Sequence, residues 1–262
     1  MKYGFIGCGN MGGAIASALS KATKDIMISD PSPKARELAA ALGVAYGTNE
    51  EVIQNCDRVF LAVKPQMMEK VLTPLQGAFA EHKPTVITIA AGLEMATVAN
   101  MLGTPLPMIR IMPNTPVFVG QGMIVYCHNG QLKEGLLEDF LSDMQYCGKL
   151  DAIEEKLIDV ASALSGSGPA YMYMLLEALA DGAVACGLPR QAAYDYAAAT
   201  MAGSAQMVLQ SGKHPGALKD DVCSPGGSTI AGVRILEERG FRSAAMDCIC
   251  AAFQKNKELG KK

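Results

Sequence analysis

The fold class is decided by the stretch Met1-Lys2-Tyr3-Gly4-Phe5-Ile6-Gly7-Cys8-Gly9-Asn10-Met11-Gly12-Gly13-Ala14 at the start of the chain. An apolar run ending at Ile6 predicts a strand, and the small and apolar residues from Ala14 onward predict a helix. Between them lies Gly-x-Gly-x-x-Gly, which in this strand–turn–helix context is the dinucleotide-binding fingerprint. An ordinary glycine turn would need neither flanking element, so the sequence favours a bound dinucleotide.

Each glycine of this turn has a separate predicted task. Gly7 permits the tight turn, Gly9 lets the backbone approach a pyrophosphate, and Gly12 lets helix and strand pack closely. The helix N-terminus then points its N–H groups at the phosphates. The predicted cofactor contacts in this segment are Ile6, Gly7, Cys8, Gly9, Asn10, Met11 and Gly12.

Strand and helix patterns alternate from Lys2 to about Leu150. This alternation predicts an α/β Rossmann domain, a doubly wound and mainly parallel sheet with its ligand crevice at the carboxyl ends of the strands. The predicted strands are Tyr3–Ile6, Asp25–Ser29, Val59–Ala62, Thr85–Ile89, Met108–Met112 and Gly122–Tyr126. The predicted helices are Pro33–Leu42, Gln66–Leu75, Leu93–Met101 and Lys133–Met144.

Beyond Leu150 only helical patterns remain, at 154–164, 169–186, 189–210, 215–222, 228–239 and 241–258. We therefore expect a dinucleotide-binding domain at residues 1–152 and an all-helical domain at 153–262. These helices are rich in Ala, Met and Leu and carry more apolar surface than a small bundle covers by itself. An oligomer built through the second domain is the expected consequence.

Composition limits the partners and the compartment. The formal net charge of −3 leaves no basic footprint for nucleic acid. The longest apolar region, 170–188, is interrupted by Glu177 and Asp181 and is interpreted as a buried helix rather than a membrane span. The eight cysteines include no Cys-x-x-Cys pair. Reduced thiols in a cytoplasmic protein without a metal or a signal peptide are therefore expected.

The adenosine ribose is expected near the end of the second strand, at Asp30 and Ser32. An acidic residue roughly 20 positions past the glycines usually accepts the ribose hydroxyls of NAD. Facing the 2′-phosphate of NADP instead, Asp30 would repel it by roughly 4 kcal/mol per unit charge at about 4 Å. If Asp30 turns outward to cap the next helix, Ser32 with Lys34 or Arg36 could hold that phosphate. The sequence leaves both alternatives open.

Three further segments follow predicted strands at the crevice. Ala62-Val63-Lys64-Pro65 and Ala90-Ala91-Gly92 lie where a nicotinamide would bind, although a strand stop at Pro65 and a turn at Gly92 would also explain them. Met112-Pro113-Asn114-Thr115-Pro116 is a proline-framed loop that is expected to shape the pocket.

Two glycine-rich segments stand out in the helical part. The first, Ser162-Ala163-Leu164-Ser165-Gly166-Ser167-Gly168-Pro169, predicts a turn between helices and lacks the Gly-x-Ser-x-Gly of hydrolases. In the second, Ser224-Pro225-Gly226-Gly227-Ser228-Thr229-Ile230, two glycines precede a helix whose first turn carries two hydroxyls. Backbone donors and hydroxyls at a helix N-terminus suit a carboxylate, whereas an ordinary N-cap needs only one hydroxyl.

In this order, the segments resemble the pyrroline-5-carboxylate reductase family over essentially the whole chain. The resemblance rests on the glycine turn, on the three crevice segments and on 164–171. Its most specific parts are 214–216, 224–230 and 240–242. The family implies a Rossmann domain followed by a helical domain, through which subunits form interlocked dimers and often larger rings such as decamers.

The resemblance also implies roles for single residues. NADP, or NAD, is contacted by the glycine turn and by Ala62, Val63, Lys64, Pro65, Ala90, Ala91 and Gly92, with Asn49 near the adenosine ribose and Asp221 approaching from the helical domain. The substrate carboxylate is bound by Ser224, Gly227, Ser228 and Thr229. Where the family often has a threonine as proposed proton donor, this chain has Ser162, which becomes the predicted catalytic residue. A basic residue that favours NADP in the family is replaced by Asp30-Pro31.

The implied reaction is hydride transfer to the imine carbon of 1-pyrroline-5-carboxylate, giving L-proline in the last step of proline biosynthesis. A protonated imine is a good electrophile, so the protein mainly supplies orientation. A 3-hydroxy acid dehydrogenase is an alternative, but Met172 stands where those enzymes place a catalytic lysine. A non-catalytic dinucleotide sensor is a second alternative, and it would not need the 224–230 loop.

Overall fold

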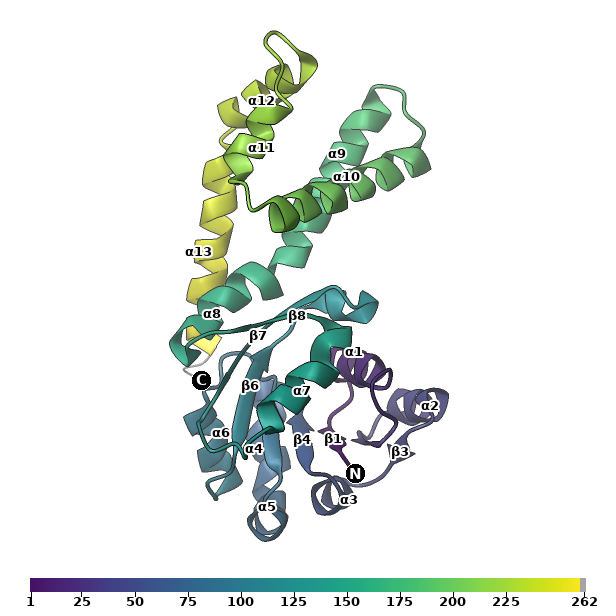
Figure 1. Cartoon of the computed structure of the whole chain (residues 1–262), viewed down its shortest axis with the longest axis vertical. Coiled ribbons are helices and arrows are strands. Elements are labelled where there is room, and N and C mark those ends of the chain that lie inside the picture. The colour runs from purple at the N-terminus through teal and green to yellow at the C-terminus, as the bar shows by residue number, and fades with distance from the viewer. Residues whose placement is uncertain (260–262) are drawn as a thin grey trace. The chain divides into compact units, whose positions relative to one another are not determined.

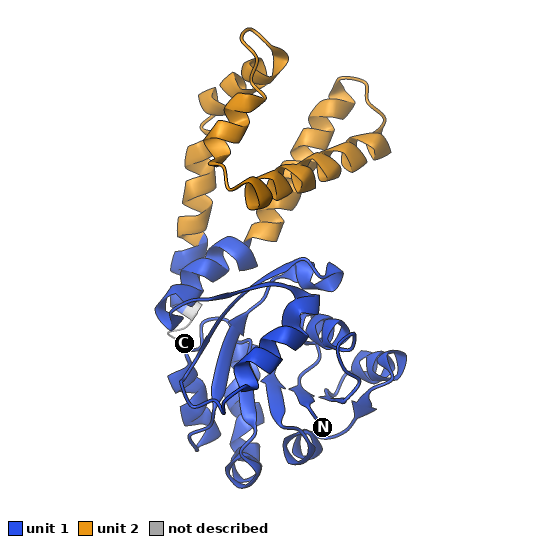
Figure 2. Ribbon diagram, viewed as in Figure 1, with its two compact units in different colours: residues 1–167, 252–262 blue, residues 168–251 orange. Residues whose placement is uncertain are grey.

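The computed structural model describes residues 1–259, which form two compact units. The first unit contains residues 1–167 and the end of the last helix from Ala252, and the second contains residues 168–251 (Figure 2). The sheet ends at Ala152, whereas the packing division falls after Ser167. The domain boundary after residue 152 therefore stays a prediction about folding units.

The first unit is built on an eight-stranded sheet in the order β3-β2-β1-β4-β5-β6-β7-β8 (Figure 1). All neighbouring strands are parallel except β6 and β7. This order and direction confirm the predicted Rossmann architecture. The strands are β1 (Tyr3–Ile6), β2 (Ile26–Ser29), β3 (Ala45–Tyr46), β4 (Arg58–Leu61), β5 (Thr85–Thr88), β6 (Met108–Met112), β7 (Gly122–His128) and β8 (Gly148–Ala152).

Helices cover both faces of the sheet, because side chains of a buried parallel strand alternate between two apolar layers. On one face lie α1 (Asn10–Leu19), α2 (Pro33–Leu42) and α7 (Leu136–Met144). On the other lie α3 (Asn49–Asn55), α4 (Met68–Leu72), α5 (Gln76–His82) and α6 (Met95–Leu102). Short 3₁₀ turns complete this unit: η1 (Pro65–Met67), η2 (Thr73–Leu75), η3 (Thr115–Val119), η4 (Gln145–Cys147) and η5 (Glu155–Leu157).

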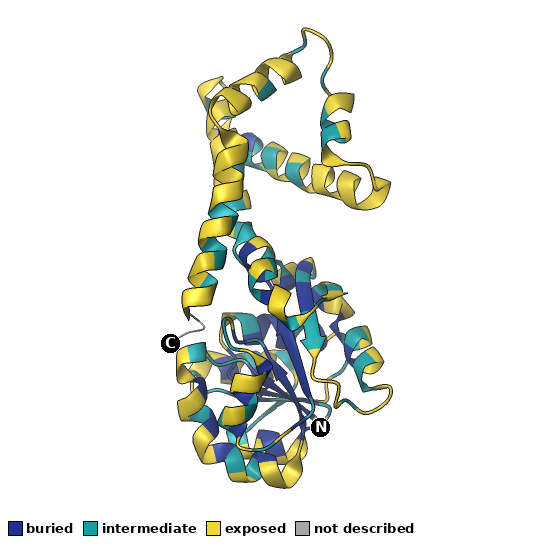
Figure 3. Cartoon of the chain, turned by 90° about the vertical axis from the view of Figure 1, so that its left-hand side faces the viewer, coloured by how far each residue is buried: buried dark blue, intermediate teal, exposed yellow. Residues whose placement is uncertain are grey.

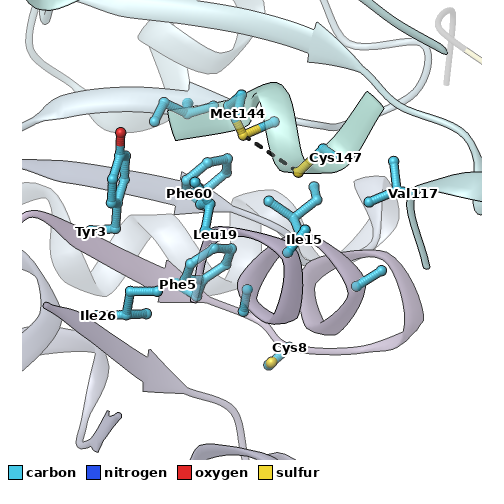
Figure 4. Packing of buried hydrophobic residues seen from close by; sticks show 14 of the residues in the cluster. Tyr3, Phe5, Cys8, Ile15, Leu19, Ile26, Phe60, Val117, Met144 and Cys147 are labelled. Atoms are coloured by element: carbon cyan, nitrogen blue, oxygen red, sulfur yellow. Dashed lines mark hydrogen bonds between the residues drawn. The ribbon is translucent and has the colours of Figure 1, made fainter. Parts of the chain in front are cut away.

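The core on the α1 side is organised by aromatic side chains. Phe5 of β1 stacks on Phe60 of β4 with ring centroids 4.5 Å apart and the rings 2° from parallel. Figure 4 shows Ile15 and Leu19 of α1 closing this layer from one side and Met144 with Cys147 from another. The stack joins neighbouring strands and holds α1, and therefore the glycine turn in front of it, against the sheet.

The sequence analysis missed β3, α3, α5 and β8. Both strands are defined by their neighbours rather than by hydrophobicity: β3 is two residues long, and β8 is a largely exposed Gly-Lys-Leu-Asp-Ala. For α3 a signal was present, because Thr48 and Glu51 form a capping box. The predicted helix over 66–75 is wrong in detail, since it is divided into η1, α4 and η2 with prolines at Pro65 and Pro74.

The segment after the sheet is helical throughout. It runs through α8 (Ile158–Ala161) and a π-helical turn, η6 (Ser162–Gly166). The turn predicted between two helices is thus a π-helix. The second unit then comprises α9 (Gly168–Ala185), α10 (Arg190–Ser211), α11 (Pro215–Asp221), α12 (Ser228–Glu238) and most of α13 (Phe241–Leu259).

The second unit buries very little of itself. Of its hydrophobic residues only Ala180 and Ala193 are buried, whereas large side chains such as Tyr173, Met174 and Leu209 are more than half exposed (Figure 3). Among residues 1–259 no helix combines the length and hydropathy needed to cross a membrane. An apolar surface of this extent on separate helices is typical of a protein–protein interface.

A charged network lies at the amino ends of the strands, opposite the predicted crevice. Arg58 of β4 is within 2.6 Å of Asp139 on α7, and Lys2 is within 3.1 Å of the same carboxylate. Burial by itself would raise the pKa of Asp139, but hydrogen bonds from Arg58 and Lys2 outweigh it and hold that pKa below 3.8. A carboxylate whose pKa is lower in the folded state stabilises the fold at any pH above its unfolded-state pKa. This stability is lost as the pH falls through its folded-state pKa.

We therefore expect Asp139→Asn to lower the free energy of unfolding at neutral pH by about 1 kcal/mol, the upper range for partly exposed ion pairs. The difference from the parent should shrink as the pH drops below about 4, where the parent carboxylate also becomes neutral. Urea unfolding followed by circular dichroism at about pH 7, 5 and 3.5 measures this, with the exposed neighbour Glu138→Gln as control. A difference that is constant with pH would contradict the assignment.

Candidate active site

Two glycines of the first turn are required by the protein itself. Gly7 has φ +92°, and a Cβ there would lie 2.8 Å from backbone atoms of Ala62 and Val63. A Cβ on Gly12 would lie 2.8 Å from the Gly7 carbonyl oxygen. The turn is therefore packed against the segment that follows β4, so two of the predicted cofactor segments are in contact.

Gly9 is different, because nothing in the protein requires a glycine there. Its φ is −68°, and a Cβ would meet no atom within 4 Å. Gly9 is also the N-cap of α1, where no side chain caps the helix and no acidic residue lies in the first turn. Open space in front of an uncapped helix N-terminus is what a pyrophosphate needs, so the residues present fit a dinucleotide.

Asp30 accepts two main-chain N–H groups of the protein. Its Oδ2 accepts the N–H of Cys8 at 2.7 Å, and its Oδ1 accepts the N–H of Ser32 at 2.8 Å. The N-cap of α2 is Ser32, so Asp30 is not the residue that begins this helix, as one of the two alternatives had it. The carboxylate instead joins the glycine turn to the start of α2, and both of its oxygens accept protein N–H groups.

The neighbouring Cys8 thiol stays protonated at neutral pH. Burial first, and the Asp30 carboxylate second, raise the pKa of the Cys8 thiol to about 11. A neutral thiol beside the glycine turn adds no negative charge to a site for phosphates, and it is not a nucleophile. Within the described residues no group of three His, Cys, Asp or Glu side chains has the arrangement of a metal site.

Asn49 lies beside the end of β2, as predicted for a residue near the adenosine ribose. The Ser29 hydroxyl donates to Asn49 Oδ1 at 2.7 Å, which fixes the amide plane. The Asn49 Nδ2 group has no hydrogen-bond partner within residues 1–259 and remains available to a ligand. Ser29 lies in the segment 29–36 predicted for the ribose, but its hydrogen bond to Asn49 was not predicted.

The remaining cofactor segments lie along the same edge of the sheet. Lys64 is exposed at the start of η1, while Ala90 is buried just after β5 and Gly92 turns there with φ +74°. The Ile89 N–H donates to the Leu61 carbonyl, so the ends of β4 and β5 adjoin. The edge therefore runs continuously from Asn49 through the glycine turn to Ala90.

Ser162 belongs to the same unit as this edge. It is 8% exposed, and within residues 1–259 its hydroxyl has no hydrogen-bond partner. By contrast the Ser165 hydroxyl donates to the Ala161 carbonyl. The loop after β6 reaches this turn through Asn114, whose Nδ2 donates to the Ser165 carbonyl at 2.9 Å. The turn that bears Ser162 is therefore bonded to the loop that follows β6, the strand next to β5.

Arg110 is a buried charge that the sequence analysis missed. It is 1% exposed in β6, and its guanidinium lies 3.1 Å from Glu155 and 3.2 Å from Asp159. Glu155 also accepts the N–H of Met95 at 2.7 Å, next to the Ala90–Gly92 turn. A single arginine inside the apolar strand Met-Ile-Arg-Ile-Met was the available signal. Arg110 ties the segment that leads to Ser162 onto the sheet.

The predicted substrate loop lies in the second unit. Gly226 turns with φ +69°, Gly227 is the N-cap of α12, and no acidic residue lies in the first turn of that helix. The exposed hydroxyls of Ser228 and Thr229 stand there beside uncapped N–H groups. Asp221 pairs with Lys213 at 2.9 Å. The approach of Ser224, Asp221 and this loop to the cofactor edge stays a prediction.

An uncapped helix behind a turn that only glycine can occupy defines the class to which this chain belongs, the dinucleotide-binding Rossmann proteins. Within that class, a family model described as pyrroline-5-carboxylate reductase dimerisation matches residues 155–259. Another, described as NADP oxidoreductase coenzyme F420-dependent, matches residues 2–92. The pyrroline-5-carboxylate reductase of Escherichia coli (strain K12) is 42% identical, over 99% of this chain and 98% of that protein. The chain belongs to the pyrroline-5-carboxylate reductase family.

Solved structures agree with this assignment. The pyrroline carboxylate reductase of Plasmodium falciparum with NADP bound superposes with a TM-score of 0.89 at 34% identity, covering 99% of this chain and 98% of that one. The 1-pyrroline-5-carboxylate reductase of Streptococcus pyogenes gives 0.89 at 34%, covering 98% of each chain. The predicted family, and with it the predicted order of Rossmann and helical parts, is confirmed.

Proposed function

We propose that this chain reduces 1-pyrroline-5-carboxylate to L-proline with NADPH, the last step of proline biosynthesis. The observations that carry the proposal are the continuous edge from Asn49 to Ala90 and the π-turn of Ser162, which Asn114 bonds to the loop after β6. The chain is 42% identical to a curated reductase of that name over nearly its full length. The reaction moves a hydride to the imine carbon and a proton to the imine nitrogen, which together give the secondary amine of proline.

The protein's part in this reaction is binding and orientation. When bound, the cofactor supplies the hydride. The glycine turn and Asn49 hold its pyrophosphate and adenosine ends, while Ala62–Pro65 and Ala90–Gly92 line the nicotinamide end. The loop Ser224–Thr229 binds the substrate carboxylate through N–H groups and hydroxyls. Ser162 holds the proton that the imine nitrogen receives.

NADPH is proposed as the preferred dinucleotide, with NADH as a weaker substrate. Both oxygens of the Asp30 carboxylate already accept a protein N–H, from Cys8 and Ser32, which leaves fewer lone pairs for the ribose hydroxyls of NAD. Ser32 makes no side-chain cap bond, and no acidic residue lies in the first turn of α2. The guanidinium of Arg36 lies 5.0 Å from the Tyr46 ring centroid. The Ser32 hydroxyl offers a 2′-phosphate a hydrogen-bond donor, and the Arg36 guanidinium offers further donors and a positive charge.

A spectrophotometric assay tests the function. Consumption of NADPH at 340 nm should depend on added pyrroline-5-carboxylate and yield proline, with a lower KM for NADPH than for NADH. Oxidation of a 3-hydroxy acid with NADP⁺, and no reaction with pyrroline-5-carboxylate, would instead establish the dehydrogenase alternative. Dinucleotide binding without turnover of either substrate would indicate a sensor.

The second unit is proposed to form a homodimer, and dimers are proposed to assemble into a larger ring such as a decamer. An apolar groove of about 460 Å³ runs between α9 and α10, lined by Leu175, Leu179 and Tyr196 among others. The exposed apolar side chains on these helices support burial against a second copy. The cytoplasm is the proposed location, where the free cysteines of the chain stay reduced.

Thr229→Ala is expected to raise the KM for pyrroline-5-carboxylate by about 10- to 100-fold, because a hydrogen bond to a charged group contributes about 1.5–3 kcal/mol. The KM for NADPH should stay within about twofold of the parent. The control is Ser243→Ala, which removes an exposed hydroxyl from α13 in the same unit. An unchanged substrate KM in Thr229→Ala would refute the carboxylate site.

A further inference from the structure

The π-helical turn that carries Ser162 contains a carbonyl without its usual donor. In an α-helix each carbonyl accepts the N–H four residues on. For Ser165 that residue is Pro169, which has no N–H. Asn114 supplies the missing donor, because its Nδ2 lies 2.9 Å from the Ser165 oxygen. A side chain from the loop after β6 thus donates to a carbonyl whose partner four residues on has no N–H.

The other end of the Asn114 amide is also engaged. Its Oδ1 accepts the N–H of Met123 at 2.9 Å, on β7. Asn114 is 8% exposed and follows β6 after a single proline. Because both ends of the amide are bonded to main chain, the side chain has one orientation, and it fixes the π-turn to the sheet.

The position of the Ser162 hydroxyl depends on this turn. The Ser162 carbonyl accepts the N–H of Ser167 at 3.1 Å, five residues on, which is the π-helical pattern. A Cβ at Gly166 would lie only 3.1 Å from Ser162 Oγ. Rewinding the turn to α geometry changes its winding by one residue, about 100° around the axis. Ser162 would then point in another direction relative to one of the flanking helices.

We propose that Asn114 is a positioning residue for the reaction: it holds the π-turn so that the Ser162 hydroxyl is aimed at the substrate nitrogen. This inference rests on the proposed function, in which Ser162 holds the proton. Arg110 holds the preceding residues through Glu155 and Asp159, so the segment is attached to β6 before the π-turn as well as at it. Asn114 contacts the π-turn itself, at Ser165, whereas Arg110 contacts residues before the turn.

Asn114→Asp tests the inference. The substitution keeps the shape and the acceptor for Met123, but it places an oxygen against the Ser165 carbonyl oxygen. We expect kcat to fall by at least about tenfold, while the dissociation constant for NADPH stays within about twofold. If this variant does not fold, Asn114→Ser is used instead. Its side chain is too short to donate to the Ser165 carbonyl, and the same fall in kcat is expected.

A matched control is available in Asn129, which contacts the opposite end of β6. Asn129 makes the same kind of bridge at the other end of β6, accepting the N–H of Met108 at 3.1 Å and donating to the Leu106 carbonyl at 2.8 Å. Asn129→Asp makes the identical chemical change away from Ser162. Its kcat should stay within about twofold of the parent even where its thermal stability falls as much as that of Asn114→Asp.

A double-mutant cycle separates positioning from a structural effect. In a Ser162→Ala background, Asn114→Asp should lower kcat by no more than about twofold further, because the group that it positions is gone. Independent losses that multiply would overturn the inference. The inference would also be overturned if the single variant Ser162→Ala is slow while the single variant Asn114→Asp is as fast as the parent. That result would leave the proposed function intact. Normal turnover in Ser162→Ala would remove the proton-donor role itself.

Discussion

Ser162→Ala is expected to lower kcat for pyrroline-5-carboxylate reduction by about a hundredfold or more, since general acid catalysis contributes about 10²–10⁴-fold. Ser162 is 8% exposed and its hydroxyl makes no hydrogen bond within residues 1–259, so its removal breaks no hydrogen bond of the described chain. The KM for NADPH and the melting temperature should therefore remain close to those of the parent.

Ser165→Ala is the control for this experiment. It makes the same change on the same π-turn, but the hydroxyl removed there donates to the Ala161 carbonyl. Its kcat should stay within about threefold of the parent. Turnover of Ser162→Ala within twofold of the parent would remove Ser162 from the reaction.

Gly7→Ala and Gly9→Ala are expected to fail for different reasons. At Gly7 the positive φ costs about 1–2 kcal/mol, and overlap with main-chain atoms of the next strand end adds about 1–3 kcal/mol. This variant should lose much of the stability of the first unit. Gly9→Ala meets no protein atom, so its melting temperature should hold. Its dissociation constant for NADPH should rise at least about tenfold, because the methyl group lies where the pyrophosphate approaches.

Thermal unfolding and NADPH fluorescence titration measure the two effects separately. Gly77→Ala is the matched control, since Gly77 lies on α5 and a Cβ there also meets no atom within 4 Å. It should leave NADPH binding unchanged and raise the melting temperature slightly, since Ala is about 0.5–1 kcal/mol more favourable than Gly inside a helix. If Gly9→Ala binds NADPH as the parent does, the open space above the turn is not the pyrophosphate site.

Much of the fold followed from local patterns. The strands β1, β2, β4, β5, β6 and β7 and the long helices of the second unit are strongly apolar or strongly periodic, so each was predicted within a few residues. By contrast β3 and β8 are strands only because β2 and β7 offer them hydrogen bonds. The π-turn after α8 was also beyond a periodicity argument, because it is bonded to a donor far away in the chain, Asn114, which follows β6.

The candidate site also has parts that the sequence predicted and parts that it could not predict. The glycine turn could be predicted because a positive φ and close main-chain packing restrict the residue type itself, and Gly7 and Gly12 meet that restriction. The role of Asp30 could not, because an identical side chain can face a ribose, cap a helix or, as here, accept the Cys8 N–H. Side-chain orientation is set by which unpaired N–H groups lie nearby, and that is a property of the folded chain.

By itself the sequence therefore determined the class of fold, the family and the identity of the dinucleotide turn, all of which depend on residue types at fixed spacing. The tertiary structure alone decided where Asp30 points, that Gly9 has open space in front of it, and that Asn114 holds the turn bearing Ser162. The physical reason is that hydrogen-bond partners far apart in the chain, such as Asn114 and Ser165, are matched only when the sheet brings them together.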